Sequence, residues 1–311
     1  MWSGNLFDPA GADYNSAVTS TRLNASAPSP PRWRVGALPF LNAVPLIHGL
    51  DADPGIKLHR LPPAQLADAL DAGRLDAALV PSIDYQRSGR DWLILPAPVI
   101  ASAGPILTVR VFSRLPFDQL TALACDPDSH TSVVLAQVLW RLVYRRGLSV
   151  APLVRDPAGP RRASAILLIG DKVIPQLGRW PYELDLGQAW THCTRLPFVY
   201  AFWGVCADPA GDWDPLVARL RRARASAAAQ LDRLADGHGP RHGFTPPLAR
   251  RYLRENLLYD PDPRLWQGLE RFFDLADQLH LMPRRRPLRF HSYSPADVPR
   301  PRRAACPSVD A

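Results

Sequence analysis

Short apolar segments alternate with amphipathic ones in the first part of this chain. Strands are predicted at Trp33–Ala37, Ile56–Arg60 and residues 75–80. Helices are expected between them, beginning near Pro45 and Pro63, because proline is favoured in the first turn of a helix. Strands that alternate with helices in this way indicate an α/β fold with a parallel sheet covered on both faces.

Two more strands are predicted far apart in the sequence, at residues 104–113 and 196–203. The segment between them forms an α/β unit of its own, with a strand at 123–125, a helix at 131–146, the apolar strand Ala165–Ile169, and irregular structure from 170 to 195. The helix is the clearest of these, because its apolar residues fall on one stripe. They are Val134, Leu135, Val138, Leu139, Leu142 and Val143.

The rest of the chain is predicted to be helical, at residues 215–235, 247–258 and 263–281. A chain that leaves one α/β lobe, builds a second and then returns has the layout of a two-lobed protein with a ligand cleft between the lobes. The expected division is a disordered extension at 1–32, lobe I at 33–112 and 206–283, lobe II at 113–205, and a basic disordered tail at 284–311.

The net charge of the chain does not change the predicted fold class. The chain has 311 residues, of which 47% are hydrophobic, and a formal net charge of +8. About +6 of that charge lies at residues 284–303, where seven arginines face a single aspartate. A solvated tail is preferred over an RNA-binding arm, so no nucleic-acid partner is expected.

Several classes of protein are not indicated by the sequence. No apolar run reaches the ~18 to 20 residues of a membrane-spanning helix, and the N-terminal segment lacks a signal-peptide core, so a cytoplasmic location without membrane contact is expected. The four cysteines form no CxxC pair, which argues against a zinc knuckle or a disulfide framework. His238 and His242 lie among glycines and prolines, so neither a metal nor a cofactor is predicted.

Candidate chemistry gathers at three turns. Ser129-His130-Thr131-Ser132 opens the amphipathic helix, where hydroxyls and free backbone N–H groups could bind a carboxylate; a plain capping motif is the alternative. Asn42 follows the first strand, and Asp171 follows Ala165–Ile169 and Gly170. Both lie at carboxyl ends of strands, where open α/β sheets bind ligands, but an ordinary turn asparagine and a helix-capping aspartate would also explain them.

Taken together, the motifs resemble the chorismate dehydratases of the futalosine route to menaquinone, which share the two-lobed fold of type 2 periplasmic binding proteins. The resemblance spans about residues 34–281. It rests on the order and spacing of Val35-Gly36, Phe40-Leu41-Asn42, Leu79-Val80-Pro81-Ser82-Ile83-Asp84-Tyr85, Gly104-Pro105, Ser129 with Thr131-Ser132, Leu167-Leu168-Ile169-Gly170-Asp171, Asp185-Leu186-Gly187 with Trp190, and Leu196-Pro197-Phe198-Val199.

The resemblance implies roles for particular residues. Asn42 falls on a principal active-site residue of that family, and Thr108 on a functional hydroxyl that is often serine. His130 replaces a family arginine, and Ser164 replaces a frequent aspartate. The related 1,4-dihydroxy-6-naphthoate synthases have a catalytic histidine at the position of Gly170, so the chain resembles the dehydratase rather than the synthase.

The implied activity is that of a hydro-lyase that converts chorismate to 3-[(1-carboxyvinyl)oxy]benzoate and water without a cofactor. Asn42 and Thr108 would be catalytic, and the substrate's own enolpyruvyl carboxylate would act as the base. The substrate would be bound by Ser129, Thr131, Ser132, Gly170 and Asp171. The alternative is a non-catalytic binding protein that captures a small carboxylate in the same cleft. The oligomeric state stays open.

Overall fold

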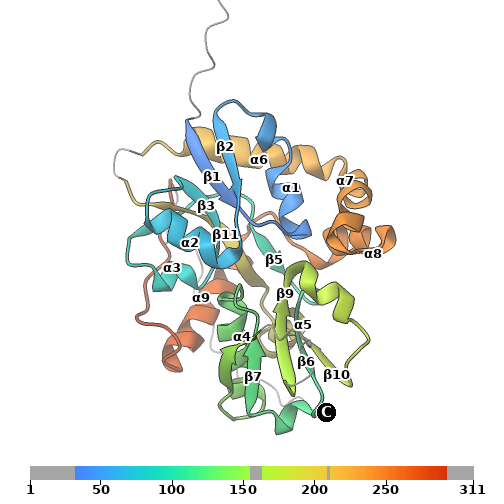
Figure 1. Cartoon of the computed structure of the whole chain (residues 1–311). Coiled ribbons are helices and arrows are strands. Elements are labelled where there is room, and N and C mark those ends of the chain that lie inside the picture. Colours follow the sequence, from blue (N-terminus) through green and yellow to red (C-terminus); the bar gives the residue numbers. More distant parts are fainter. Residues whose placement is uncertain (1–31, 155–162, 209–210, 293–311) are drawn as a thin grey trace, which may run out of the picture.

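The computed structural model describes residues 32–154, 163–208 and 211–292. Within these residues the strands form two sheets, each at the centre of one lobe, and the lobes lie one above the other in Figure 1. Nearly all of the predicted N-terminal extension, residues 1–31, lies outside the described part of the chain. The α/β two-lobed architecture predicted from the sequence is confirmed.

Lobe I is built on a sheet in the order β2-β1-β3-β11-β4, with β5 also paired to β11. Its strands are β1 (Trp33–Ala37), β2 (Ile56–Arg60), β3 (Ala77–Pro81), β4 (Trp92–Ile94), β5 (Ile100–Ser102) and β11 (Phe198–Cys206). The first three pair in parallel, as predicted. The returning strand β11 runs antiparallel to β3, β4 and β5.

Lobe II is built on a sheet in the order β10-β6-β9-β7-β8. Its strands are β6 (Val109–Ser113), β7 (Ala122–Cys125), β8 (Ser149–Pro152), β9 (Ala165–Ile169) and β10 (Tyr182–Asp185). Strand β6 is antiparallel to both β9 and β10, whereas β7 is parallel to β8 and β9. Every residue of β9 is buried, which explains its uninterrupted apolar sequence.

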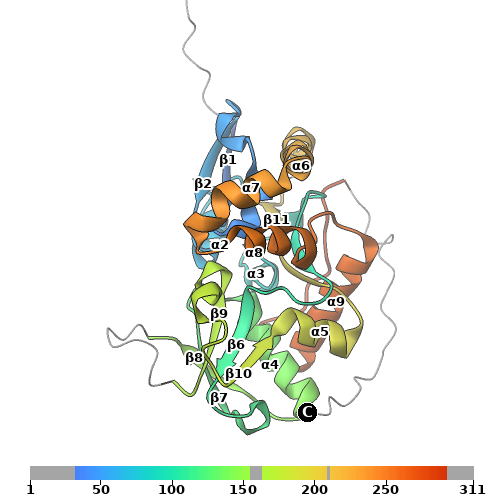
Figure 2. The same ribbon diagram turned by 90° about the vertical axis from the view of Figure 1, so that its right-hand side faces the viewer.

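Helices surround both sheets, as Figures 1 and 2 show. They are α1 (Val44–Ile47), α2 (Pro63–Asp71), α3 (Asp84–Arg87), α4 (Thr131–Val143), α5 (Leu186–Thr194), α6 (Asp214–Ala228), α7 (Leu231–His238), α8 (Pro246–Arg251) and α9 (Pro263–Gln278). Short 3-10 segments are η1 (Leu41–Ala43), η2 (Leu50–Ala52), η3 (Phe117–Gln119), η5 (Gly170–Gln176) and η6 (Gly239–His242), and a π-helical turn, η7 (Tyr252–Asn256), follows α8. No helix in the described residues is long and apolar enough to cross a membrane.

The chain crosses between the lobes one strand away from each predicted boundary. Strand β6 lies in the lobe II sheet, although its residues before 113 were assigned to lobe I. Strand β11 lies in the lobe I sheet, although residues up to 205 were assigned to lobe II. An apolar strand can be buried in either sheet, so its sequence does not reveal which partner it pairs with.

Three other sequence predictions were wrong in part. Residues 170–195 were expected to be irregular but contain η5, β10 and α5. The helix predicted at 215–235 is two helices, because the backbone leaves the helical region at Gln230 with φ −135° and ψ 29°. Disorder was expected from residue 284, but Leu288 is buried and Phe290 pairs with Ile94 in an isolated β-bridge. The remainder of the predicted tail, 293–311, lies outside the described residues.

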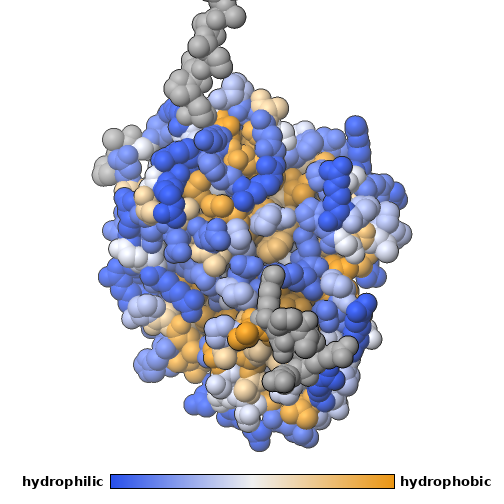
Figure 3. Space-filling model, in the orientation of Figure 1, coloured by the Kyte–Doolittle hydropathy of each residue, from blue (hydrophilic) through white to orange (hydrophobic). Residues whose placement is uncertain are grey.

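Helix α9 ties the end of the chain to both lobes. It packs against β11 and also touches α4 of lobe II, and Figure 2 shows it beside α5 along one side of the molecule. The packing is close: a Cβ atom at Gly268 would overlap the carbonyl oxygen of Pro197, just before β11. The outer surface in Figure 3 is mostly hydrophilic, with smaller hydrophobic patches between the polar side chains.

Candidate active site

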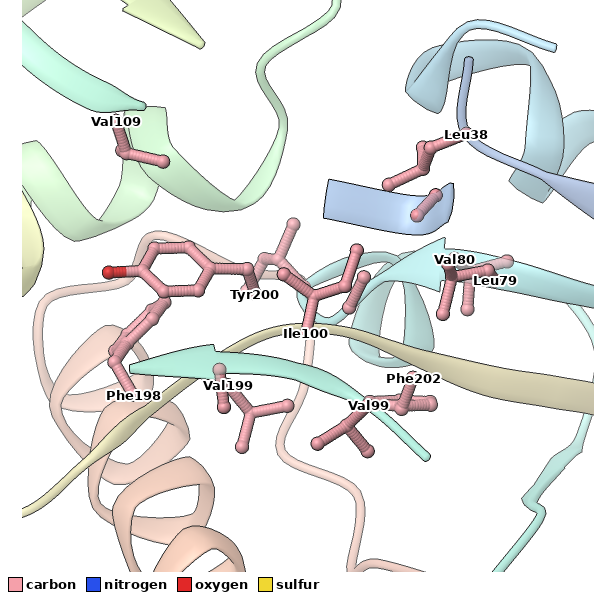
Figure 4. Close-up of a cluster of buried hydrophobic side chains, with 14 of the residues drawn as sticks. Leu38, Leu79, Val80, Val99, Ile100, Val109, Phe198, Val199, Tyr200 and Phe202 are labelled. Carbon is pink, nitrogen blue, oxygen red and sulfur yellow. The ribbon is translucent and has the colours of Figure 1, made fainter. Parts of the chain in front are cut away.

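A pocket with an empty volume of about 510 Å³ lies between the two lobes. Lobe I contributes Leu38, Phe40, Asn42, Pro63, Pro81, Ile100, Tyr200 and Ala201 to its lining; Ile106, Thr108, Val109, Asp128, Ser129, His130, Thr131, Ser132, Ile169 and Gly170 come from the crossing segment and lobe II. In Figure 4, Val109 lies on the opposite side from Leu38 and Ile100, and the Tyr200 hydroxyl points toward the Val109 side. Apolar walls with a few polar groups are typical of small-molecule sites.

Asn42 lies in η1, directly after β1, and only 8% of its surface is exposed. Its Oδ1 atom is buried and has no hydrogen-bond partner among the described residues. The turn that carries it is held from lobe II, because the Leu41 N–H donates to both carboxylate oxygens of Asp171 at 3.3 Å. A buried polar atom without a partner costs free energy, so Asn42 Oδ1 is suited to a ligand's hydrogen-bond donor.

Thr108 ends the first crossing between the lobes, immediately before β6. Its side chain is buried, and its Oγ1 atom lies 2.6 Å from the hydroxyl oxygen of Tyr252. The preceding residue, Leu107, has a φ of 69°, a left-handed conformation that a branched residue rarely adopts. Such strain persists only where the surroundings enforce it, and it often marks functional sites.

Hydrogen bonds to Asp185 hold Leu107 in this left-handed conformation. Its carboxylate is buried and accepts hydrogen bonds from the backbone N–H groups of Ile106 at 3.1 Å and Leu107 at 2.7 Å. It also caps α5 by accepting from the N–H groups of Gly187 and Gln188. One carboxylate therefore fixes both the crossing segment that presents Thr108 and the start of the helix beneath it.

The start of α4 is where the sequence predicts a site for an anionic group. Ser129, Thr131 and Ser132 are all buried and line the pocket. No side chain caps the helix, so its first N–H groups have no side-chain acceptor, and the capping-motif alternative is not what the structure shows. The Ser129 Oγ atom also lacks a partner among the described residues. Free donors at a helix start favour binding of an anionic group.

Thr131, unlike Ser129, already has hydrogen-bond partners in lobe I. Its Oγ1 atom accepts a hydrogen bond from the Ile83 N–H at 3.2 Å and lies 3.4 Å from the Ser82 hydroxyl, both in lobe I. The side chain therefore joins the two lobes beside the pocket. Its remaining hydrogen-bonding capacity for a ligand is smaller than that of Ser129.

His130 makes a second connection between the lobes. Its Nδ1 atom lies 2.9 Å and 2.8 Å from the two carboxylate oxygens of Asp84 in α3. This hydrogen bond raises the pKa of the imidazole; burial opposes the shift, and the charge of Asp84 adds to it. The ring thus acts as a partner of a lobe I carboxylate at the edge of the pocket.

Asp171 and Gly170 occupy different positions relative to the pocket. Gly170 lines it and has a φ of 63°, and a Cβ atom there would come within 2.9 Å of the Phe40 ring. Asp171, predicted to contact substrate, is not among the lining residues. Its Oδ2 atom lies 2.7 Å from Nδ1 of His242, which comes from the segment between α7 and α8. Asp171 therefore supports the Asn42 turn from behind.

Three residues near the site were not identified from the sequence as functional candidates. Tyr200 lines the pocket, and its hydroxyl lies 3.2 Å from the Ser102 hydroxyl; burial raises its pKa well above 10, so it stays protonated. Its signal was a tyrosine inside an otherwise apolar strand. Tyr252 gave no local signal, and His242 was considered only as a metal ligand with His238 and rejected. The relation of both residues to the site depends on how the C-terminal helices pack.

The chain has the two-lobed α/β fold that is also found in periplasmic binding proteins. An Archaeoglobus fulgidus protein of known structure superimposes with a TM-score of 0.64 at 16% identity, covering 80% of this chain and 98% of that one. The alkanesulfonate-binding protein of Xanthomonas axonopodis pv. citri superimposes with a TM-score of 0.58 at 18% identity, covering 83% and 96%. These likenesses concern the fold.

Sequence comparison gives the family. Residues 33–278 match the family described as menaquinone biosynthesis, and the chain belongs to it. A chorismate dehydratase of Thermus thermophilus is 28% identical over 234 residues, which cover 69% of this chain and 84% of that enzyme.

Proposed function

We propose that this protein is a chorismate dehydratase, a hydro-lyase that acts on a small molecule in the pocket between its lobes. The observation that carries the proposal is the gathering of Asn42, Thr108 and Ser129 around one buried pocket, with unpartnered oxygen atoms on Asn42 and Ser129. The family membership and the Thermus thermophilus relative support the same activity.

The reaction needs little chemistry from the protein. The hydrogen on ring carbon 3 of chorismate leaves as a proton, its bonding electrons enter the ring, and hydroxide departs from carbon 4 and takes up a proton to form water. The product, 3-[(1-carboxyvinyl)oxy]benzoate, is aromatic, which provides the thermodynamic drive. Holding the diene and both carboxylates rigidly contributes ~7 to 11 kcal/mol to the barrier reduction.

The pocket supplies neutral hydrogen-bonding groups for this task. Asn42 Oδ1 accepts a hydrogen bond from the substrate's C4 hydroxyl, and an amide N–H of Asn42 stabilises the negative charge that develops on the ring. Thr108 holds a carboxylate or the leaving hydroxyl. The start of α4, with Ser129 and Ser132, binds the other carboxylate. Gly170 has no side chain, which allows the ring of Phe40 to pack against it at the pocket wall. A Cβ atom at position 170 would collide with that ring.

The base is the substrate's enolpyruvyl carboxylate. Among the described residues that line the pocket, Asp128 is the only carboxylate, and it is paired with Lys172 at 2.8 Å. His130 is engaged with Asp84, and the buried Tyr200 keeps its proton because its pKa is raised. An intramolecular carboxylate, held near carbon 3 by the pocket, replaces a protein base.

Incubation of the purified protein with chorismate, followed by mass spectrometry, tests the proposal. The expected result is enolpyruvyl benzoate formed in step with the loss of chorismate. The competing interpretation is a protein that binds a small carboxylate and releases it unchanged. Tight binding of chorismate by calorimetry, without product, would contradict the dehydratase and favour the binding protein.

A further inference from the structure

Tyr252 lies beside the two residues proposed to be catalytic without lining the pocket itself. It begins the π-helical turn η7, its surface is fully buried, and its ring stacks on Phe244 with a centroid distance of 5.2 Å. Its hydroxyl lies 2.6 Å from Thr108 Oγ1. The side chain of Asn42 is near enough to lower the pKa of Tyr252 against the larger effect of burial. π-Helical turns are rare and are frequently found at functional sites.

The direction of the hydrogen bond between Thr108 and Tyr252 follows from the acceptors within reach. Burial raises the pKa of Tyr252, so its hydroxyl keeps its proton. Among the described residues, Asn42 Oδ1 has no partner, and Thr108 Oγ1 is the acceptor that lies within hydrogen-bond distance of the Tyr252 hydroxyl. Because a buried hydroxyl proton is nearly always donated, Tyr252 donates to Thr108 Oγ1.

Thr108 is consequently an acceptor toward Tyr252, and its own hydroxyl proton is free for another partner. The ligand in the pocket provides that partner, because Thr108 lines the pocket. If Thr108 instead donated to Tyr252, its oxygen lone pairs would face a carboxylate or a departing hydroxide, and the interaction would be repulsive.

We propose that Tyr252 is a positioning residue that keeps Thr108 as a hydrogen-bond donor to the bound substrate. This inference rests on the proposed dehydratase activity. A donor aimed at the leaving hydroxyl gains strength as negative charge develops there, so its orientation affects turnover more than ground-state binding.

Tyr252→Phe tests the inference, because it removes the hydroxyl and keeps the stacked ring. We expect kcat to fall by about 10- to 100-fold while KM changes by less than about threefold. Tyr259→Phe is the matched control: Tyr259 is equally buried, and its hydroxyl has no hydrogen-bond partner among the described residues. That variant should keep kcat within about twofold.

A double-mutant cycle with Thr108→Val separates positioning from a general structural effect. In the Thr108→Val background, Tyr252→Phe should reduce kcat by much less than in the wild-type chain, because the acceptor is already absent. Independent, multiplicative losses would overturn the inference, as would a Tyr252→Phe variant with wild-type kcat. If Tyr252→Phe does not fold, wild-type turnover by Thr108→Val would overturn it instead. Absence of turnover in the wild-type protein would refute the proposed function, which keeps the two failures distinct.

Discussion

The polar side chains of the pocket differ in how much of their hydrogen-bonding capacity is already used. Thr131 is occupied by Ser82 and Ile83 of lobe I, and Thr108 accepts a hydrogen bond from Tyr252. Asn42 Oδ1 and Ser129 Oγ, by contrast, have no partner among the described residues. Because buried polar atoms in native proteins are nearly always paired, these two atoms are the strongest candidates for contact with a ligand.

The contribution of Thr108 can be separated into its hydroxyl and its methyl group. Thr108→Ser keeps the hydroxyl and should retain most of the wild-type kcat. Thr108→Val has nearly the same shape but lacks both the acceptor for Tyr252 and the donor to the ligand, so kcat should fall by about 10-fold or more. Steady-state kinetics with chorismate gives the comparison, and equal activity of the two variants would contradict the assigned role.

Asp171 provides a test of the substrate-assisted base. Asp171→Asn keeps an oxygen that can accept from the Leu41 N–H, so the Asn42 turn should stay in place and kcat should remain within about threefold of wild type. The measurement is kcat together with chorismate affinity by calorimetry. Loss of turnover with unchanged affinity would contradict the expectation that the Asp171 carboxylate is dispensable for proton transfer.

At the scale of elements, the sequence predicted best those segments whose apolar runs have sharp ends. Strands β1, β2 and β9 begin and end as predicted. Strand β10 and helix α5 were not predicted. Strand β10 is only partly buried, so its sequence is not a clear apolar run, and α5 follows it directly at the capping residue Asp185, without a turn segment to mark where the helix begins. Strands β4 and β5 have three residues each, too few to produce a recognisable pattern.

In the candidate active site, too, residues with a local sequence signal could be predicted and residues placed by tertiary packing could not. Asn42 and the start of α4 could be predicted because strand ends and helix starts can be recognised locally. Tyr252 could not, since it lies 144 positions after Thr108 and meets it only through tertiary packing. The contacts of Thr131 with Ser82 and Ile83, and the position of Asp171 behind the Asn42 turn, also depend on partners from the other lobe, which the local sequence does not reveal.

Helix α9 and the second crossing are expected to be sensitive to a single added methyl group. Gly268→Ala would push a Cβ atom into the carbonyl of Pro197 and should lower the free energy of unfolding by about 1 to 3 kcal/mol. Gly237→Ala in α7 is the control, because its Cβ atom would meet nothing within 4 Å and alanine favours a helix, so stability should be equal or higher. Chemical denaturation measures both, and a stable Gly268→Ala variant would show that α9 packs less closely than described.

At the scale of the whole molecule, two histidine–aspartate pairs join the lobes. One is His130 with Asp84, and the other is His242 with Asp171. Each residue of a pair belongs to a different lobe. We place the lobe boundaries before β6 and before β11, where the chain passes from one sheet to the other. We propose that the two histidine–aspartate pairs help to hold the lobes closed around the substrate.

The His130 pair makes stability depend on pH in a definite direction. The pKa of His130 is raised above its ordinary value of 6.5, mainly by the hydrogen bond to Asp84; Asp68 adds to the shift, and Arg87 opposes it. A raised folded-state pKa means that the pair stabilises fully below the ordinary pKa and loses its effect as pH rises through the folded-state value. His130→Gln should therefore lower the melting temperature more at pH 5.5 than at pH 8.5. The first pH lies about one unit below the ordinary histidine pKa of 6.5, and the second about two units above it.

The control for this pH dependence is His192→Gln, since His192 is exposed on α5. Its difference in melting temperature from the wild type should not change with pH in the same way. A His130→Gln variant whose destabilisation is constant, or grows toward high pH, would contradict the charged pair between the lobes.

The proposed function depends on dehydration of chorismate in the pocket that contains Asn42. Turnover and chorismate affinity should be measured for the wild type and Asn42→Ala side by side. We expect the wild type to form enolpyruvyl benzoate. The Asn42→Ala variant should bind chorismate about as well but turn it over with a barrier ~2.7 to 4 kcal/mol higher, as for the loss of an oxyanion-hole donor. Full activity of Asn42→Ala, or no product from the wild type, would contradict this proposal.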